Sequence, residues 1–261
     1  IEYEFCLFLK RFADENQISI YKLVEEIDGG QNEKNLSSSI RLFCFELAHN
    51  RLSADTVNFS ASTSSLKKGE SFKDTVQNIE SMKIDAAVMR HPIPGSPLQL
   101  TNYIDAVVIN AGDGAHEHPT QAILDIMSLH EKFGYLKGLK IAIIGDTMHS
   151  RVALSNIYGL KTMGAEVMLC GPSTLIPRYA EDLGVKISYS IDEVIEWADA
   201  LNVLRIQRER MQGGLLPSIR EYRDLFGITN ERMLKHKKEI VVLHPGPINR
   251  GVEIDLSLIH I

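Results

Sequence analysis

The chain has 261 residues, of which 44% are hydrophobic and 24% are charged, and its net charge is −6. This composition is ordinary for a globular protein with a sizeable core, and the acidic balance argues against a nucleic-acid-binding protein. No apolar run of 18 residues predicts a membrane span, and the Cys and His residues show no zinc-binding spacing. The three cysteines are few and lie in apolar contexts, so a reduced, cytoplasmic protein is expected.

Elements with strand and helix spacing alternate along the whole chain. The first run is predicted to contain short helices at residues 21–27 and after Ser37, a strand at 56–59, a helix at 72–82, and buried strands at 86–89 and 106–109. A polar turn follows at 110–121, and then a helix that ends near residue 133. The second run is predicted to contain strands at 140–144, 166–170, 185–188, 200–204 and 239–243, with helices at 151–163, 177–183, 191–197, 216–226 and 230–236.

This alternation predicts an α/β protein with two tandem domains, each a parallel sheet with helices on both faces. The first domain is expected at residues 1–132, of which 1–36 are atypical, and the second at 133–255. The final hexapeptide, residues 256–261, resembles the translated end of a sequencing adaptor. A non-native tail is therefore expected there.

The turn from Asn110 to Gln121 lies between a strand predicted to be fully buried and an amphipathic helix. At such a junction of an open α/β sheet, unpaired N–H groups of the helix start favour an anionic ligand. Gly112 and Gly114 allow an unusual backbone and a close approach of a ligand. His118 and Gln121 are three residues apart and can face the same way, although a lone His-x-x-Gln is more often an ordinary surface loop.

Most of the predicted buried strands lead into a basic or polar cluster. These clusters contain Arg90, the pair His118 and Gln121, Arg151, the pair Arg205 and Gln207, and the loop 244–250. Because the carboxyl ends of parallel strands meet along one crevice, the sequence predicts a site for a small anionic substrate. Motifs for dinucleotides, nucleoside triphosphates and serine hydrolases are absent. The polar set suits electrostatic polarisation of a carbonyl, as in group transfer from a phosphorylated donor to a dicarboxylate.

Four segments resemble motifs of the aspartate carbamoyltransferase family, in that family's order. They are Asn110-Ala-Gly-Asp-Gly with His118-Pro-Thr-Gln121, Gly145-Asp with His149-Ser-Arg151, Leu204-Arg-Ile-Gln with Glu209-Arg210, and His244-Pro-Gly-Pro-Ile-Asn-Arg250 with Gly-Val-Glu-Ile254. The resemblance covers about residues 41 to 255. It implies a carbamoyl phosphate domain and an aspartate domain, a homotrimer with shared active sites, and synthesis of carbamoyl aspartate for pyrimidines. The implied reaction needs no metal or organic cofactor. A regulatory subunit is left open.

Roles follow from the resemblance position by position. His118 would polarise the carbamoyl oxygen, and Arg90 would hold that oxygen or the phosphate. Gln121 with the carbonyls of Gly246 and Pro247 would contact the carbamoyl NH2. Arg151, Arg205 and Gln207 would bind the aspartate carboxylates. Ser64 and Lys68 match a loop that reaches a neighbouring subunit's site, and Ser37 and Arg41 match the first phosphate motif. His116, two residues before His118, is expected to be exposed and without a role.

The first phosphate motif departs from the family pattern. Ser39 replaces an arginine that would bind phosphate, and Ile40 replaces a threonine. Two explanations are an assembly or reading-frame error upstream of about residue 41 and an inactive, ligand-binding member of the family. A carbamoyltransferase for another amino acid is a further alternative. Ornithine is disfavoured as the acceptor because the turn reads His244-Pro-Gly-Pro instead of His-Cys-Leu-Pro and because paired arginines suit a dicarboxylate.

Overall fold

The computed structural model describes residues 54–57, 59, 71–207, 215–216, 218–236 and 239–258. The chain divides into two compact units, residues 1–70 and 71–261, and nearly all described residues belong to the second. The helices predicted at 21–27 and after Ser37 lie outside the described residues. Thr56, Val57 and Phe59 belong to no strand, so the strand predicted at 56–59 is wrong for these three residues. Among the described helices, none is long and apolar enough to cross a membrane.

Two parallel strands precede the polar turn. Strand β1 (Ala86–His91) pairs with β2 (Val107–Asp113). β1 contains the strand predicted at 86–89, and β2 contains residues 107–109 of the strand predicted at 106–109. Val88 is 50% exposed and none of the six residues of β1 is buried, so the prediction that residues 86–89 are buried is wrong. Helix α4 (Phe72–Glu80) begins at the N-cap Ser71 and ends two residues earlier than predicted, and a short helix, α5 (Ser96–Leu100), follows β1. Val76, Leu100 and Ile104 form the core between these helices and one face of the strand pair.

The prediction that residues 106–109 form a fully buried strand is wrong. Val107 is 65% exposed and Ile109 is 39% exposed, whereas Val108 packs against the core on the opposite face. Side chains alternate between the two faces of a strand, and no described element covers the face that carries Val107. Strand β2 also continues to Asp113, so the first four residues of the predicted turn are part of the strand.

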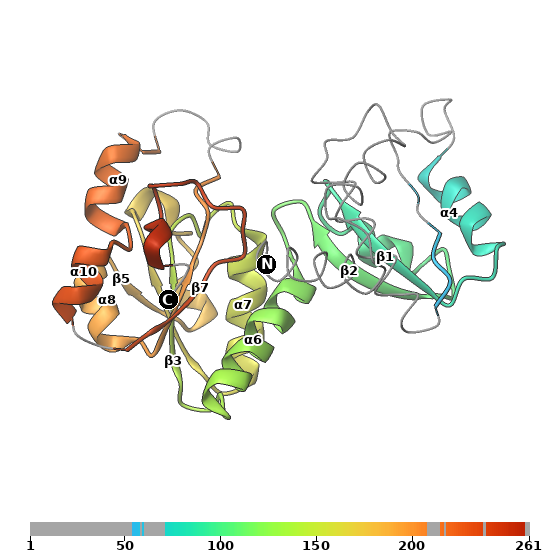
Figure 1. The fold of residues 1–261 in the computed structure, drawn as a ribbon. Coiled ribbons are helices and arrows are strands. Elements are labelled where there is room, and N and C mark those ends of the chain that lie inside the picture. The colour runs from blue at the N-terminus through green and yellow to red at the C-terminus, as the bar shows by residue number, and fades with distance from the viewer. Residues whose placement is uncertain are drawn as a thin grey trace, which may run out of the picture. The chain divides into compact units, whose positions relative to one another are not determined.

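A five-stranded parallel sheet forms the core of the second half of the chain (Figure 1). Its strand order is β5-β4-β3-β6-β7, with β3 in the middle. The predicted strands are confirmed to within two residues at each end. Their observed bounds are β3 (Lys140–Ile144), β4 (Glu166–Cys170), β5 (Lys186–Ser188), β6 (Ala200–Val203) and β7 (Val241–Leu243).

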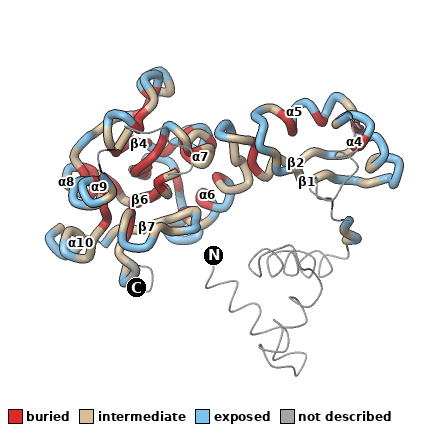
Figure 2. Tube along the Cα trace, turned by 90° about the horizontal axis from the view of Figure 1, so that it is seen from above, coloured by how far each residue is buried: buried red, intermediate tan, exposed pale blue. Residues whose placement is uncertain are grey.

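Helices cover both faces of this sheet, as predicted. Alternate residues of β3 separate into two cores, because Ile141 and Ile143 belong to one cluster while Ala142 and Ile144 belong to the other. Helices α6 (Pro119–Phe133) and α7 (Arg151–Thr162) supply the first cluster. Helices α8 (Ile191–Trp197), α9 (Ile219–Phe226) and α10 (Asn230–His236) supply the second. Figure 2 shows the buried stretches gathered at β4, β6 and α7.

The helix predicted at 177–183 is wrong. The connection between β4 and β5 contains two single 3₁₀ turns, η2 (Ser173–Leu175) and η3 (Glu181–Leu183). Its backbone bonds, Ala180 N–H to Pro177 O and Leu183 N–H to Ala180 O, span three residues. Ala180 and Leu183 both pack against the first core cluster, and this spacing of three matches the 3₁₀ period better than the α-helical one.

Candidate active site

The crevice of the five-stranded sheet lies where β3 and β6 are neighbours, because the chain crosses to opposite sides of β3 before and after this point. Asp146 follows β3 and is fully buried. Its Oδ2 accepts the backbone N–H of Gln207, after β6, at 3.3 Å, and its Oδ1 accepts the N–H of His149 at 3.2 Å. A single carboxylate therefore joins the loops that follow the two strands.

Arg151 is the first residue of α7 and reaches the polar turn. Its Nη1 donates to the carbonyl oxygen of Gly114 at 3.3 Å. A Cβ atom added to Gly112 would lie 2.7 Å from the Arg151 Cζ, and Gly112 has a φ of +117°. The predicted unusual backbone is confirmed at Gly112, and the group that lies close to this glycine is a guanidinium of the neighbouring helix.

Asp113 holds the turn in shape. Its Oδ2 accepts the N–H of Gly95 at 2.8 Å, and its Oδ1 accepts the N–H of Glu117 at 2.9 Å. The Nδ1 atom of His116 lies 3.2 Å from the same carboxylate, while the His116 side chain is 53% exposed. The expected exposure of His116 is confirmed, and its ring contributes to the shape of the turn.

His118 is the N-cap of α6 and is packed against α7. Its backbone N–H donates to Ser155 Oγ at 2.8 Å, and Thr120 Oγ1 lies 3.2 Å from its Nδ1. Burial lowers the pKa of His118 to about 4, and the positive charges of Arg151 and Arg90 act in the same direction. The imidazole is therefore neutral near pH 7, with two cationic side chains close enough to act on it.

Gln121 lies in the first turn of α6, three residues after His118. Its Nε2 donates to Asp125 Oδ1 at 2.9 Å, and the Asp125 side chain is nearly fully buried. The predicted placement of His118 and Gln121 at a helix start is confirmed.

Arg205 and His244 follow the adjacent strands β6 and β7. Burial, and secondarily the charge of Arg205, lowers the pKa of His244 to about 4. His244 Nδ1 accepts the N–H of Gly246 at 2.9 Å, and the peptide bond between Gly246 and Pro247 is cis. The structure thus places Arg205 near the start of the loop that carries both predicted carbonyl contacts.

Glu253 connects the loop that follows β6 to the loop that follows β7. Its fully buried side chain accepts the N–H of Ile206 at 2.8 Å and the N–H of Asn249 at 3.1 Å. Ile206 lies between Arg205 and Gln207, so the carboxylate fixes the backbone that carries both predicted aspartate contacts.

Four of the predicted site residues, Ser37, Arg41, Ser64 and Lys68, lie outside the described residues, as do Ser39 and Ile40. The supporting carboxylates Asp113, Asp125 and Glu253 were not predicted. Asp125 has one sequence signal, because it is an acidic residue among apolar residues of a helix and is four residues from Gln121. In the described part of the chain, no group of three or more His, Cys, Asp and Glu is placed to hold a metal ion.

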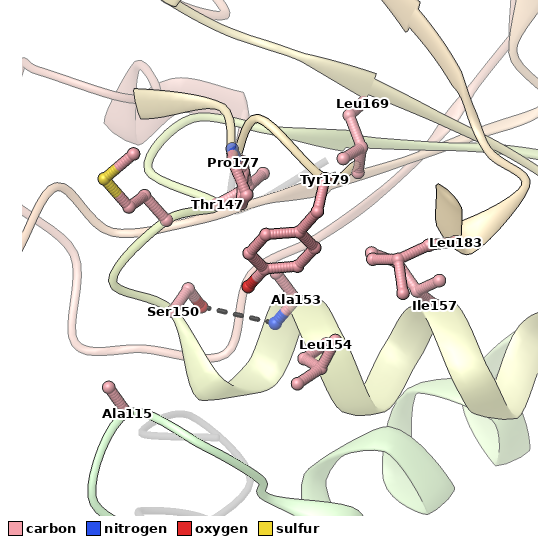
Figure 3. A pocket seen from close by; sticks show the side chains of 11 residues that line it. Ala115, Thr147, Ser150, Ala153, Leu154, Ile157, Leu169, Pro177, Tyr179 and Leu183 are labelled. Carbon is pink, nitrogen blue, oxygen red and sulfur yellow. Dashed lines mark hydrogen bonds between the residues drawn. The ribbon is translucent and has the colours of Figure 1, made fainter. Parts of the chain in front are cut away.

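A small cavity of about 30 Å³ lies beside the crevice (Figure 3). It is lined by Ala115 of the turn, by Thr147 and Ser150 before α7, and by Tyr179. Ser150 Oγ accepts the N–H of Ala153 at 3.3 Å and so caps the helix beneath the cavity. Such a volume holds water and is too small for a substrate.

Two family models together match most of the chain. Residues 37–131 match the carbamoyl-phosphate-binding domain of aspartate/ornithine carbamoyltransferases, and residues 137–260 match the aspartate/ornithine-binding domain. Residues 1–48 match a ribbon-helix-helix domain, so this match and the first one overlap at residues 37–48. The atypical residues 1–36 are thus similar to a second family, which was not predicted from the sequence.

Named relatives and solved structures that are similar to this chain include members of the same family. The chain is 58% identical over 210 residues to the aspartate carbamoyltransferase catalytic subunit of Christiangramia forsetii, covering 80% of this chain and 68% of that protein. The corresponding Cytophaga hutchinsonii subunit is 56% identical with the same coverage. Aspartate transcarbamoylase of Trypanosoma cruzi, solved with N-(phosphonacetyl)-L-aspartic acid, has a TM-score of 0.73 at 31% identity, covering 84% of this chain and 71% of that one. The M. jannaschii catalytic subunit has a TM-score of 0.68 at 33% identity, covering 84% and 72%.

Proposed function

This chain belongs to the aspartate/ornithine carbamoyltransferase family, and we propose that it transfers the carbamoyl group of carbamoyl phosphate to the amine of L-aspartate. The products are N-carbamoyl-L-aspartate and phosphate. The observation that carries this proposal is the neutral imidazole of His118 beside two arginines, at the end of a strand and the start of a helix. A neutral imidazole can donate a hydrogen bond to a carbonyl oxygen without giving up a proton.

The reaction forms a carbon–nitrogen bond between the aspartate amine and the carbamoyl carbon and breaks the bond from that carbon to the phosphate oxygen. The amine loses one proton, which leaves with the phosphate. Negative charge develops on the carbamoyl oxygen in the tetrahedral intermediate. We assign the Thr120 hydroxyl as the donor to His118 Nδ1, which lies 3.2 Å away. In this tautomer Nε2 carries the proton and donates a hydrogen bond to the carbamoyl oxygen, while Arg90 adds positive charge. Preorganised donors and charges of this kind lower the barrier without a covalent intermediate.

The remaining substrate contacts are assigned by the family motifs. Arg151, Arg205 and Gln207 bind the aspartate carboxylates, for which forked guanidinium groups are well suited. Gln121 and the carbonyls of Gly246 and Pro247 bind the carbamoyl NH2. Ser37 and Arg41 bind the phosphate, and Ser64 and Lys68 complete the site of a neighbouring subunit in a homotrimer.

The family resemblance also suggests the cellular setting. In this proposal the chain acts in pyrimidine biosynthesis, in the cytoplasm, as one subunit of a catalytic trimer. The second candidate function is that of an inactive carbamoyltransferase-like subunit that binds ligand, and the observation in its favour is Ser39 and Ile40 in the phosphate motif.

Measuring carbamoyl aspartate produced from carbamoyl phosphate and aspartate tests the proposal. We expect His118→Ala to lower kcat by about 10²–10³, as for other single oxyanion donors. His130→Ala, on the exposed end of the same helix, is the matched control and should retain activity. Arg205→Ala should raise the KM for aspartate, and Arg220→Ala, an exposed arginine of α9, should not.

Two other results would decide between the candidate functions or contradict the assigned site. A wild-type chain that binds carbamoyl phosphate without producing carbamoyl aspartate would support the inactive subunit. Full activity of both His118→Ala and Arg205→Ala would contradict the assigned site.

A further inference from the structure

Asp125 has an unusual position for a carboxylate. It lies on α6, is 5% exposed, and accepts hydrogen bonds from amide groups on three different elements. Oδ1 accepts from Gln121 Nε2 of the same helix at 2.9 Å, and Oδ2 accepts from Asn156 Nδ2 of α7 at 2.7 Å and from Asn202 Nδ2 of β6 at 2.9 Å. The carboxylate is thereby fixed against rotation.

Burial of these polar groups reduces the free energy of unfolding. Burial raises the pKa of Asp125 above its usual value, although the three amide donors favour its ionised form. The Oδ1 atoms of Asn156 and Asn202 are also buried and have no hydrogen-bond partner among the described residues. A buried polar group that is only partly satisfied reduces stability, so a benefit other than stability is expected.

The benefit lies in the orientation of Gln121. A carboxamide can present either its NH2 donor or its oxygen acceptor, whereas an ionised carboxylate only accepts hydrogen bonds. Both oxygens of Asp125 accept hydrogen bonds from amide NH2 groups. The Nε2 end of Gln121 therefore faces Asp125, and Oε1 is left to accept from another group. An acceptor at this place suits a ligand group that donates, as the carbamoyl NH2 does.

We propose that Asp125 is a positioning residue that selects for a carbamoyl group by holding the Gln121 carboxamide with its oxygen toward the substrate. This inference rests on the proposed function. Its consequence concerns specificity, because acetyl phosphate has the same phosphate and carbonyl as carbamoyl phosphate but carries a methyl group in place of NH2. A methyl group cannot donate to Gln121 Oε1, so the fixed orientation favours the carbamoyl substrate.

The test is the ratio of kcat/KM for carbamoyl phosphate to that for acetyl phosphate, with aspartate as the acceptor of both. Asp125→Asn keeps the shape of the side chain but supplies a donor as well as an acceptor, so Gln121 loses its fixed orientation. We expect this variant to lose about tenfold in kcat/KM for carbamoyl phosphate and to change little for acetyl phosphate. The ratio should therefore fall.

Two further variants separate positioning from a structural effect. In a Gln121→Ala background, Asp125→Asn should cause no additional loss of the ratio if it acts through Gln121. Asn156→Ser removes one donor to Asp125 and leaves the Gln121 contact in place. It should lower the midpoint of urea unfolding without changing the ratio.

Equal losses for both phosphates in Asp125→Asn would overturn the inference while leaving the proposed function intact. If the wild-type chain formed no product, the same comparison would be made by calorimetric titration with the two phosphates. A wild-type preference for carbamoyl phosphate that Asp125→Asn removes would then support the inference. Absence of this preference, or its persistence in the variant, would overturn the inference.

Discussion

At the scale of single residues, buried ionisable side chains hold the loops of the crevice. Asp113 binds backbone N–H groups of the polar turn, Asp146 joins the loops after β3 and β6, and Glu253 joins the loops after β6 and β7. Each carboxylate accepts hydrogen bonds that would be costly to leave unmade in a buried site. Hydrogen bonds to buried carboxylates thus hold the backbone of the loops that carry the arginines of the candidate site.

The two histidines with lowered pKa values predict a pH dependence of stability. His118 and His244 have pKa values of about 4 in the folded protein, whereas an unfolded histidine has about 6.5. Between these values the unfolded chain binds protons that the folded chain does not. The free energy of unfolding should therefore be highest above about pH 6.5 and should decrease as the pH falls toward 4.

Urea unfolding of the wild type and of His244→Asn at about pH 7.5, 6.5, 5.5 and 4.5 measures this dependence. The variant lacks one of the two groups, so its stability should fall less over the same range. Parallel curves for the two proteins would contradict the pKa assigned to His244. His130→Asn, at an exposed histidine, serves as the control and should follow the wild type.

At the scale of elements, the site depends on how α6 and α7 begin. Pro119 is the first residue of α6, and Ser150 caps α7 through the N–H of Ala153. The helices pack closely, because a Cβ added to Gly159 of α7 would lie 2.7 Å from Ile126 Cδ1 of α6. This packing brings Arg151 against the turn that leads into α6, so two helix starts and one guanidinium converge on one place.

Gly112→Ala should disturb this convergence. The new Cβ would lie 2.7 Å from Arg151 Cζ, so the guanidinium would have to move. We expect a raised KM for aspartate with a smaller change in the KM for carbamoyl phosphate. Gly134→Ala is the matched control because Gly134 also has a positive φ, +76°, but a Cβ added there would have no atom within 4 Å. An equal loss in both variants would mean that backbone strain, and not displacement of Arg151, is responsible.

At the scale of the molecule, the two sheets differ in how much of them is covered. Ile144 of β3 is fully buried in the core formed with α8 and α9, whereas Val107 of β2 is 65% exposed. Apolar burial stabilises in proportion to the area removed from water. Stability of the described part is therefore concentrated in the five-stranded sheet.

Truncation of one residue in each sheet tests this difference. Ile144→Ala should reduce the free energy of unfolding by about 2–5 kcal/mol, since it leaves a cavity in a closely packed core. Val107→Ala should change it by less than about 1 kcal/mol because its side chain is largely in solvent. Urea unfolding measures both, and a large loss for Val107→Ala would show that another part of the chain covers this face of β2.

The five strands between residues 140 and 243, their parallel arrangement and the position of His118, Gln121 and Arg151 at strand and helix ends could be predicted from the sequence. Those features depend on local apolar runs and on residues that start or end elements, which can be recognised without knowing the packing partners. The exposure of Val107, the 3₁₀ turn within residues 177–183 and the hydrogen bond from Gln121 to Asp125 are known only from the structure. Burial and hydrogen-bond pairing depend on which distant residues pack together, and a single sequence does not specify those neighbours.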